Sequence, residues 1–273
     1  MITATFRGMP GIGPSREREL WEKGFRSWDD LPAEGPILSP KLDEKLRGAV
    51  NEAREMLRRR DLEAMAAWLP ANERWRLWPR FTAETCFLDI ETDGDSETVT
   101  AISLFSEQGP QAFVRGFDLE AFPAALARYG VVVTFNGASF DLPVLRKAFP
   151  ELRVPPVHVD LRFLYQRLGE RGGLKALEKK LGLTRPGAVE GVDGWEAVKL
   201  WRRWSSGRDV GALCKLVEYN LYDAIQLRPL LELAWNRLVE QSGLELPLCS
   251  IWQRGEVLYD VSRILIRLRH ATL

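Results

Sequence analysis

The first strand-like segment of the chain is Cys86-Phe87-Leu88-Asp89-Ile90-Glu91, in a sequence of 273 residues. Because successive side chains of a strand point to opposite faces, Asp89 and Glu91 are expected on one face, where both carboxylates can converge on one cation. Leu88 and Ile90 then point the other way, into the core. An Asp-x-Glu pair is weakly diagnostic by itself, since charges at a strand end that faces solvent give the same pattern.

The residues after this strand predict a mixed sheet with flanking helices. Residues 99–106 and 112–117 read as two further strands joined by the turn Gln108-Gly109-Pro110, which gives an antiparallel three-stranded start. The other expected elements are a short buried strand at 131–135 and helices at 119–129, 140–149, 161–168, 174–181, 195–204 and 213–241. This order of elements indicates an α/β fold in which helices flank a mixed sheet.

The N-terminal part of the chain reads as helix and turn, without strand-like alternation. A helix at 16–23 is expected to end at Gly24, and Ser27 can cap a second short helix. A longer charged helix is expected from Pro40 to about residue 68, before a connector rich in Trp and Arg at 72–80. The expected parts of the chain are a small all-helical region at 1–80, an α/β domain at 81–242, and a C-terminal extension at 243–273, with 263–269 as strand or helix.

The charges of the chain are balanced. Lys plus Arg total 38, as do Asp plus Glu, so the formal net charge is zero. The overall charge therefore predicts no nucleic-acid partner, and any binding of phosphate must come from local patches or from metal ions. The hydrophobic content of 45% allows a substantial core and argues against a disordered chain.

The cysteines and the N-terminus favour a reducing compartment. Cys86, Cys214 and Cys249 are far apart, odd in number and without the paired spacing of a zinc site or a disulfide framework. Residues 1–7 contain no apolar run long enough for a signal peptide, and no later stretch approaches a membrane span. We therefore expect a soluble, cytoplasmic protein with no membrane partner.

Two later segments carry further carboxylates. Asn136-Gly137-x-x-Phe140-Asp141 follows the expected strand at 131–135, and ligands tend to gather at such strand ends in open sheets. Alternatively, Asn136 caps the turn and Asp141 only suits a helix N-terminus. Tyr219-x-x-x-Asp223 lies in an expected helix, where positions i and i+4 share a face, so the phenol and the carboxylate point the same way. Alone, this pattern is also typical of a half-buried tyrosine on a solvated helix.

In combination and order, the three segments resemble the motifs of the DEDD exonuclease superfamily, whose members have a ribonuclease-H-like fold. The resemblance covers about residues 85–240. It indicates the tyrosine-type branch (DEDDy), because Glu218 stands where the histidine-type branch has His. Further segments are most similar to the bacterial YprB-like group: His158-Val159-Asp160-Leu161, Gly173-Leu174-Lys175-x-Leu177-Glu178 and Tyr219-Asn220.

The resemblance implies a nuclease that hydrolyses phosphodiester bonds of DNA or RNA with two divalent ions, as a 3′-to-5′ exonuclease. Asp89 would bridge both ions. Glu91 and Asp223 would hold the ion that activates water, and Asp141 would support the second ion through water. Tyr219 would orient the nucleophilic water, because a phenol with an unperturbed pKa near ~10 is a poor base at neutral pH.

The residue types also limit the choice of metal and of function. Hard oxygen ligands suit Mg²⁺ or Mn²⁺, whereas only two His and the scattered Cys argue against zinc. An endonuclease of the same fold and a non-catalytic nucleic-acid-binding module are the alternatives to an exonuclease. Retention of the four carboxylates and Tyr219 argues against the non-catalytic module.

Several residues near the motifs have more than one reading. Asp160 either caps the following helix or forms, with His158, a pair that orients a metal carboxylate or a phosphate. Lys175 either reaches a backbone phosphate or is solvated. Phe140 either wedges against a terminal base or packs under its own motif. The candidate nucleic-acid contacts of the domain are Asn136, Phe140, His158 and Lys175, whereas core positions are expected for Trp195, Trp201 and Trp204.

The N-terminal segment resembles a helix-hairpin-helix. Gly11-Ile12-Gly13 would form the hairpin, and Leu20 and Trp21 would pack the second helix. Such a glycine turn exposes backbone N–H groups at a helix N-terminus, where they can hold a phosphate without reading a base. The same motif also serves as a plain packing unit.

Overall fold

The computed structural model of the chain describes residues 1–95, 97–185, 187, 189, 191–251 and 261–272. Its α-helices are α1 (Pro14–Glu22), α2 (Pro40–Arg59), α3 (Leu62–Trp68), α4 (Phe122–Leu126), α5 (Asp141–Ala148), α6 (Leu161–Arg167), α7 (Leu174–Leu181), α8 (Gly194–Gly207), α9 (Val210–Ser242) and α10 (Ser262–Ala271). The strands are β1 (Thr85–Thr92), β2 (Val99–Ser106), β3 (Gly109–Val114), β4 (Val131–Thr134) and β5 (Val157–Asp160). Short 3₁₀ helices are η1 (Ile2–Ala4), η2 (Trp28–Asp30), η3 (Ala71–Arg80), η4 (Thr82–Glu84) and η5 (Leu119–Ala121).

The strands form one mixed sheet in the order β3-β2-β1-β4-β5. β1 pairs with β2 and β2 with β3 in antiparallel fashion, whereas β4 pairs in parallel with both β1 and β5. The predicted α/β fold, with its antiparallel three-stranded start and a small helical N-terminal region, is confirmed. β1 lies at the centre of the sheet, where both of its edges are paired, with β2 and β4.

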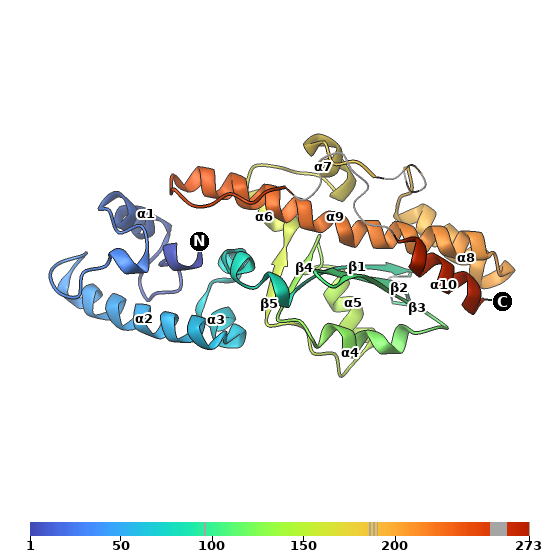
Figure 1. Cartoon of the computed structure of the whole chain (residues 1–273), viewed down its shortest axis with the longest axis horizontal. Helices are drawn as coiled ribbons and strands as arrows, with labels where there is room; N and C mark the ends of the chain where they lie inside the picture. Colours follow the sequence, from blue (N-terminus) through green and yellow to red (C-terminus); the bar gives the residue numbers. More distant parts are fainter. Residues whose placement is uncertain (96, 186, 188, 190, 252–260, 273) are drawn as a thin grey trace.

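Alternate residues of β1 belong to different cores. Phe87 lies in a hydrophobic cluster with residues of α9, which crosses one face of the sheet (Figure 1). Leu88 and Ile90 lie in a second cluster with Phe122 of α4 and Leu145 of α5, on the opposite face (Figure 1). Since Asp89 and Glu91 follow Phe87 at two-residue steps, they point towards the face that carries α9.

In the N-terminal region, the predicted end of α1 and the Ser27 cap are observed, but the predicted long helix is divided into α2 and α3. α1 stops at Glu22, and Gly24 follows with φ of 92°, as expected for a glycine after a helix. Ser27 caps η2, where a capping box forms with Asp30. The long helix expected up to residue 68 is wrong, because Arg60 adopts a left-handed conformation that ends α2. The Asp61 carboxylate then caps α3 by accepting from the Ala64 N–H at 2.9 Å.

Within the α/β domain, the bounds of one strand and one helix also differ from the prediction. The third strand was expected at 112–117 after a turn containing Gly109 and Pro110, but β3 begins at Gly109. Pro110 is tolerated there because β3 is an edge strand, where one missing N–H leaves no neighbour unpaired. The helix expected at 119–129 is only η5 followed by α4.

The sequence did not predict β5, and it left the structure of residues 263–269 open. β5 was not expected, since four residues between Pro155-Pro156 and a helix give too short a pattern for a strand. The segment 263–269, open between strand and helix, is helical in α10, and Leu268 packs in the cluster of α9. Within the part of the chain that the structure describes, no helix is both long and apolar enough to cross a membrane.

A buried ion network joins the N-terminal region to the α/β domain. Glu73 of η3 pairs with Arg76 at 2.7 Å, with Arg167 of α6 at 3.0 Å and with Arg7 at 3.6 Å. Arg76 in turn pairs with Glu17 of α1 at 3.3 Å. The Glu73 and Arg76 side chains are only 3% exposed, so each charge depends on its partners rather than on water.

We expect Glu73→Gln to destabilise the protein by about 3 kcal/mol, because it leaves buried guanidinium groups without their shared carboxylate. The measurement is the free energy of unfolding from urea titration followed by circular dichroism. Glu55→Gln is the matched control, since Glu55 pairs with Arg58 and Arg59 in solvent, and it should change the midpoint little. Equal midpoints for Glu73→Gln and wild type would contradict a stabilising role of the network.

Candidate active site

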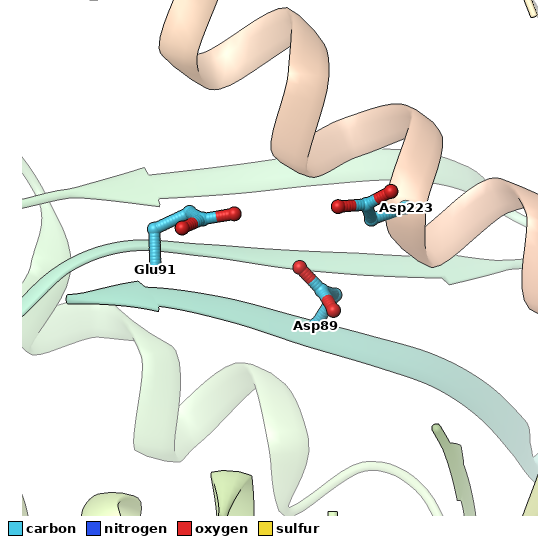
Figure 2. A group of neighbouring side chains, drawn as sticks. All are labelled: Asp89, Glu91 and Asp223. Carbon is cyan, nitrogen blue, oxygen red and sulfur yellow. The ribbon is translucent and has the colours of Figure 1, made fainter. Parts of the chain in front are cut away.

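Three carboxylates converge between β1 and α9. Asp89 and Glu91 lie on β1, opposite Ser103 and Ala101 of β2, and Asp223 lies on α9. One oxygen from each of Asp89, Glu91 and Asp223 lies within 4.8 Å of the other two. Figure 2 shows the three carboxylates turned towards a common space. The two sequence segments thus meet because α9 packs over the strand face that carries Asp89 and Glu91.

A buried amide fixes one of these carboxylates. The Asn220 side chain donates to Oδ2 of Asp89 at 2.7 Å and accepts from the Ser103 hydroxyl at 2.6 Å. Asn220 is fully buried and lies three residues before Asp223, just under one turn of α9. The chain of hydrogen bonds therefore couples the position of α9 to that of β1 and β2. Sequence analysis noted Asn220 only as part of a family resemblance and missed this role, because Asn220 and Asp89 are 131 positions apart in the chain.

The fourth carboxylate reaches the site from the other side of the sheet. Asp141 is the first residue of α5, is buried, and lines the same hollow as the other three carboxylates. Among the described residues, the close group of oxygens contains Asp89, Glu91 and Asp223 but not Asp141. Asp141 is thus placed to contact a group bound in this hollow from the α5 side, opposite Asp223 of α9.

The loop before Asp141 is held by hydrogen bonds from two strands. Asn136 adopts a left-handed conformation with φ of 66°, and its N–H donates to Asp160 at 2.8 Å. The Gly137 N–H donates to the Thr134 hydroxyl at 3.1 Å, and a Cβ at Gly137 would lie 2.3 Å from that oxygen. Glycine is therefore required at 137, which explains the Asn-Gly pair at the start of this motif.

Asp160 accepts hydrogen bonds from backbone N–H groups, and its predicted role with His158 in orienting a metal carboxylate or a phosphate stays a prediction. Its carboxylate caps α6 by accepting from the Arg162 N–H at 3.0 Å, which confirms the predicted cap. The same carboxylate accepts from the N–H groups of Asn136 and Ala138. His158 lies behind this loop, with Nε2 2.8 Å from the Thr134 hydroxyl. His158 and Asp160 thus support the loop that precedes Asp141.

Burial and mutual repulsion perturb the carboxylates. Burial, together with the charges of Asp223, Asp141 and Glu91, raises the pKa of Asp89 well above its usual range. Burial and the charge of Asp223 likewise raise the pKa of Glu91. Burial raises the pKa of Asp141 to about 7, although hydrogen bonds from backbone N–H groups oppose the change. The arrangement therefore favours a cation or a proton among these groups.

Tyr219 and Lys175 lie against the carboxylates. Tyr219 is buried on α9 and lines the hollow, and Nζ of Lys175 donates to its hydroxyl at 2.7 Å. The ammonium also contacts the carbonyl of Val192 and lies over the Tyr219 ring, 4.3 Å from its centroid. Burial, then the charges of Asp223, Glu91 and Asp89, raise the pKa of Tyr219. Lys175 is therefore a partner of the tyrosine rather than a solvated surface residue.

A buried arginine also faces the site. The guanidinium of Arg185 forms two hydrogen bonds with Glu178 of α7, at 2.6 and 2.7 Å, and an ion pair with Asp223. Burial disfavours its charge, but Asp223 and Glu178 more than compensate, and the pKa of Arg185 is raised. Sequence reasoning missed Arg185, since it lies outside every motif and no local pattern marks it.

Phe140 and the three tryptophans of α8 differ in how well they match the prediction. Phe140 is half-buried and packs against the cluster on the α5 face, and it also lines the hollow, so both of its readings persist. The core position expected for Trp195 is wrong, because this side chain is 59% exposed at the start of α8 and Arg202 lies over its ring. Trp201 and Trp204 are buried, as predicted.

The hairpin residues lie in the N-terminal region, away from the carboxylates (Figure 1). Ile12 is buried, the Gly11 carbonyl accepts from Arg16 at 2.5 Å, and Gly13 is the N-cap of α1. The element before the hairpin is the three-residue η1 rather than an α-helix. Phosphate binding by Gly11-Ile12-Gly13 stays a prediction.

Comparison with known proteins identifies the family. A model described as the RNase H superfamily matches residues 86–235, more than half of the chain. The chain belongs to the RNase H superfamily. The matched span holds all four carboxylates and Tyr219, so the superfamily fold supplies every wall of the hollow that they line.

No curated protein matches the chain. Among solved structures, a match is the family B DNA polymerase from the hyperthermophilic archaeon Pyrobaculum calidifontis, with 16% identity and a TM-score of 0.42. That match covers 67% of this chain and 29% of the polymerase chain. The chain therefore spans less than a third of the polymerase's length.

The residues present fit a hard divalent cation. The close donors of this group are carboxylate oxygens of Asp89, Glu91 and Asp223, of which Asp223 also forms an ion pair with Arg185. The raised pKa values of Asp89 and Glu91 indicate an excess of negative charge that a cation would offset. Oxygen ligands with this charge suit a hard divalent cation, and the choice of Mg²⁺ or Mn²⁺ stays a prediction.

In the metal-free protein, we expect the free energy of unfolding to fall as pH rises. The unfolded chain loses the Asp141 proton near its usual pKa of 3.8, whereas the folded chain keeps it up to about 7. The stabilisation is therefore complete at acidic pH and lost as pH passes through about 7. Asp89 and Glu91 change stability in the same direction.

Asp141→Asn should remove part of this pH dependence and stabilise the metal-free protein at about pH 8 by about 1 kcal/mol, or about 2–4 °C in Tm. The measurement is calorimetric unfolding in a chelator at acidic and alkaline pH. Glu120→Gln, at an exposed position of η5, is the control and should keep the wild-type profile. A lower Tm for Asp141→Asn than for wild type at alkaline pH would show that the buried Asp141 charge does not destabilise the folded protein.

Proposed function

We propose that the protein is a metal-dependent nuclease that hydrolyses phosphodiester bonds of nucleic acid, and that it acts as a 3′-to-5′ exonuclease of the tyrosine-type DEDD class. The observation that carries the proposal is the convergence of Asp89, Glu91 and Asp223 oxygens within 4.8 Å. Carboxylates held this close in a buried site are unfavourable without a cation. Membership of the RNase H superfamily supports the same chemistry.

In this proposal, Asp89, Glu91 and Asp223 hold two divalent ions, Mg²⁺ or Mn²⁺, with Asp141 supporting one of them. When bound, such ions stabilise charge on the phosphate and lower the pKa of water. The contribution of the chain is to hold the carboxylates in place. The hydrogen bond from Asn220 to Asp89 and the position of Asp141 at the start of α5 provide that rigidity.

Tyr219 positions water in this proposal and does not remove its proton. Its raised pKa keeps the phenol protonated at neutral pH. The hydroxyl has one proton and two lone pairs, and Lys175 occupies one lone pair. The other lone pair can accept a hydrogen bond from water beside Glu91 and Asp223. Lys175 thus fixes the direction in which Tyr219 can accept.

Arg185 provides the positive charge beside Asp223 in the ion-free protein. A guanidinium is always charged and pairs with phosphate as readily as with carboxylate. Held by Glu178, Arg185 therefore favours an anionic substrate near Asp223 while limiting repulsion among the carboxylates. A neutral substrate would gain nothing from this residue.

The remaining features of the chain are consistent with a nucleic-acid enzyme. We propose the division into residues 1–80, 81–242 and 243–273, with Gly11-Ile12-Gly13 as an additional phosphate contact, and relationship to the YprB-like group. An endonuclease of this fold is the nearest alternative, and it differs only in where along the strand the site cuts. A non-catalytic binding module would not need Tyr219 and all four carboxylates.

We expect Asp89→Asn and Asp223→Asn each to abolish hydrolysis, because each removes charge that must hold a cation in the transition state. The assay uses end-labelled single- and double-stranded DNA and RNA with Mg²⁺ or Mn²⁺, resolved as product ladders over time. Ladders that shorten from the 3′ end support an exonuclease, whereas internal products support an endonuclease. Glu120→Gln is the control and should cleave like wild type. Wild-type rates for either Asp variant would refute the site.

Tyr219→Phe should lower turnover by roughly ten- to a thousandfold, as for loss of one positioned polar group. The substitution deletes the hydroxyl but keeps the ring and all four carboxylates. Affinity for Mn²⁺, measured by calorimetry, should change little, because the carboxylates, which are the ligands that suit Mn²⁺, all remain. Unchanged turnover, with chemistry as the slow step, would remove Tyr219 from the mechanism.

A further inference from the structure

A second hollow adjoins the one that holds the carboxylates. Its walls are Phe135, Asn136, Arg162, Gln166, Arg171 and the turn Gly172-Gly173-Leu174. Phe135, Asn136 and Leu174 also line the carboxylate hollow, so the two hollows lie next to each other and share these three residues. We call the second hollow the arginine groove. A chain molecule that occupies the carboxylate hollow therefore has the arginine groove beside it.

The two hollows have opposite charge. The carboxylate hollow is lined by Asp89, Glu91, Asp141 and Asp223, whereas the described lining of the arginine groove contains two guanidinium groups and no carboxylate. This contrast is local, because the formal net charge of the whole chain is zero. Local positive charge beside a metal site is what a substrate with more than one phosphate requires.

The two arginines differ in how they are held. Nη1 of Arg162 donates to the Asn136 side chain at 2.6 Å, so this guanidinium is tied to the loop shared by both hollows. Arg171 is exposed and has no hydrogen bond or ion pair within the described part of the chain. Its neighbour Glu170 pairs with Lys180 and Arg237 instead. The charge of Arg171 is therefore free for an external anion.

The backbone of the groove also suits close approach of an anion. Gly172 has φ of 130°, and Gly173 is the N-cap of α7 without a side chain that caps the helix. A Cβ at Gly173 would meet nothing within 4 Å, so the space beside it is open. The first N–H groups of α7 add to the positive potential that the two arginines create.

We propose that the arginine groove binds the phosphodiester backbone of the nucleic-acid strand next to the bond that the carboxylate site cleaves. This inference rests on the proposed function. It makes the preferred substrate a polynucleotide rather than a small phosphate ester, because an ester of one nucleotide has no second phosphate to reach Arg162 and Arg171. The contacts are to phosphate, so they carry no base sequence.

The test compares two substrates and one matched pair of variants. Arg171→Gln removes the free charge, and Arg153→Gln is the control, because Arg153 is exposed before β5, at the opposite end of that strand from Asp160. The substrates are a single-stranded oligonucleotide, in DNA and RNA forms, and the p-nitrophenyl ester of one nucleotide. Arg171→Gln should lower kcat/KM for the oligonucleotide relative to the ester by roughly three- to tenfold. Arg153→Gln should keep the wild-type ratio.

Binding is measured separately from hydrolysis, in an Asp89→Asn background, by fluorescence anisotropy of the labelled oligonucleotide at several salt concentrations. Loss of one phosphate contact should reduce the slope of log affinity against log salt by about 0.7 for a single strand. Arg162→Gln should have a similar effect. Circular dichroism checks that each variant is folded.

The outcomes separate the two proposals. If wild type cleaves neither substrate but Arg171→Gln weakens oligonucleotide binding with a shallower salt slope, the groove binds a strand and the proposed hydrolysis is wrong. If wild type cleaves both substrates and Arg171→Gln keeps the wild-type ratio and slope, the groove proposal is overturned and the nuclease stands. Absence of oligonucleotide binding in the background protein would also overturn the groove. A preference for DNA or RNA would identify which strand it takes.

Discussion

The packing of α9 across the centre of the sheet is the constraint on which the site depends. Asp223 reaches the carboxylates of β1 only because the apolar residues of α9 are buried against that face. The raised pKa values of Asp89 and Glu91 reflect the cost of holding these groups together. Hydrophobic burial of α9, together with the buried hydrogen bonds of Asn220, offsets that cost.

Features with strong local patterns could be predicted from the sequence. The sequence predicts β1, β2 and α7 at or within a residue of their observed ends, since each is a short apolar-rich segment bounded by polar or glycine-containing turns. The candidate site could be predicted from the order of three short motifs rather than from a periodic pattern. Each motif was ambiguous alone, and the convergence of Asp89, Glu91 and Asp223 is what the fold adds.

The features that were missed depend on contacts between distant residues or on single-residue conformations. Asn220 meets Asp89 across 131 positions of the chain, so no window of sequence contains both. Arg185 lies in a stretch without periodicity and acquires its role from Glu178 and Asp223. The break between α2 and α3 comes from a left-handed Arg60, a conformation that residue type does not indicate.

Buried Arg185 contributes to the charge balance of the site. The ionisable groups that meet at the site are the carboxylates Asp89, Glu91, Asp141, Glu178 and Asp223 and the cations Lys175 and Arg185. With every group ionised, their charges leave three negative charges uncompensated. Two divalent cations would reverse the sign to a single positive charge, and one phosphodiester would cancel it. A low-polarity interior favours the neutral combination, so in the proposed mechanism cations and substrate would each improve the binding of the other.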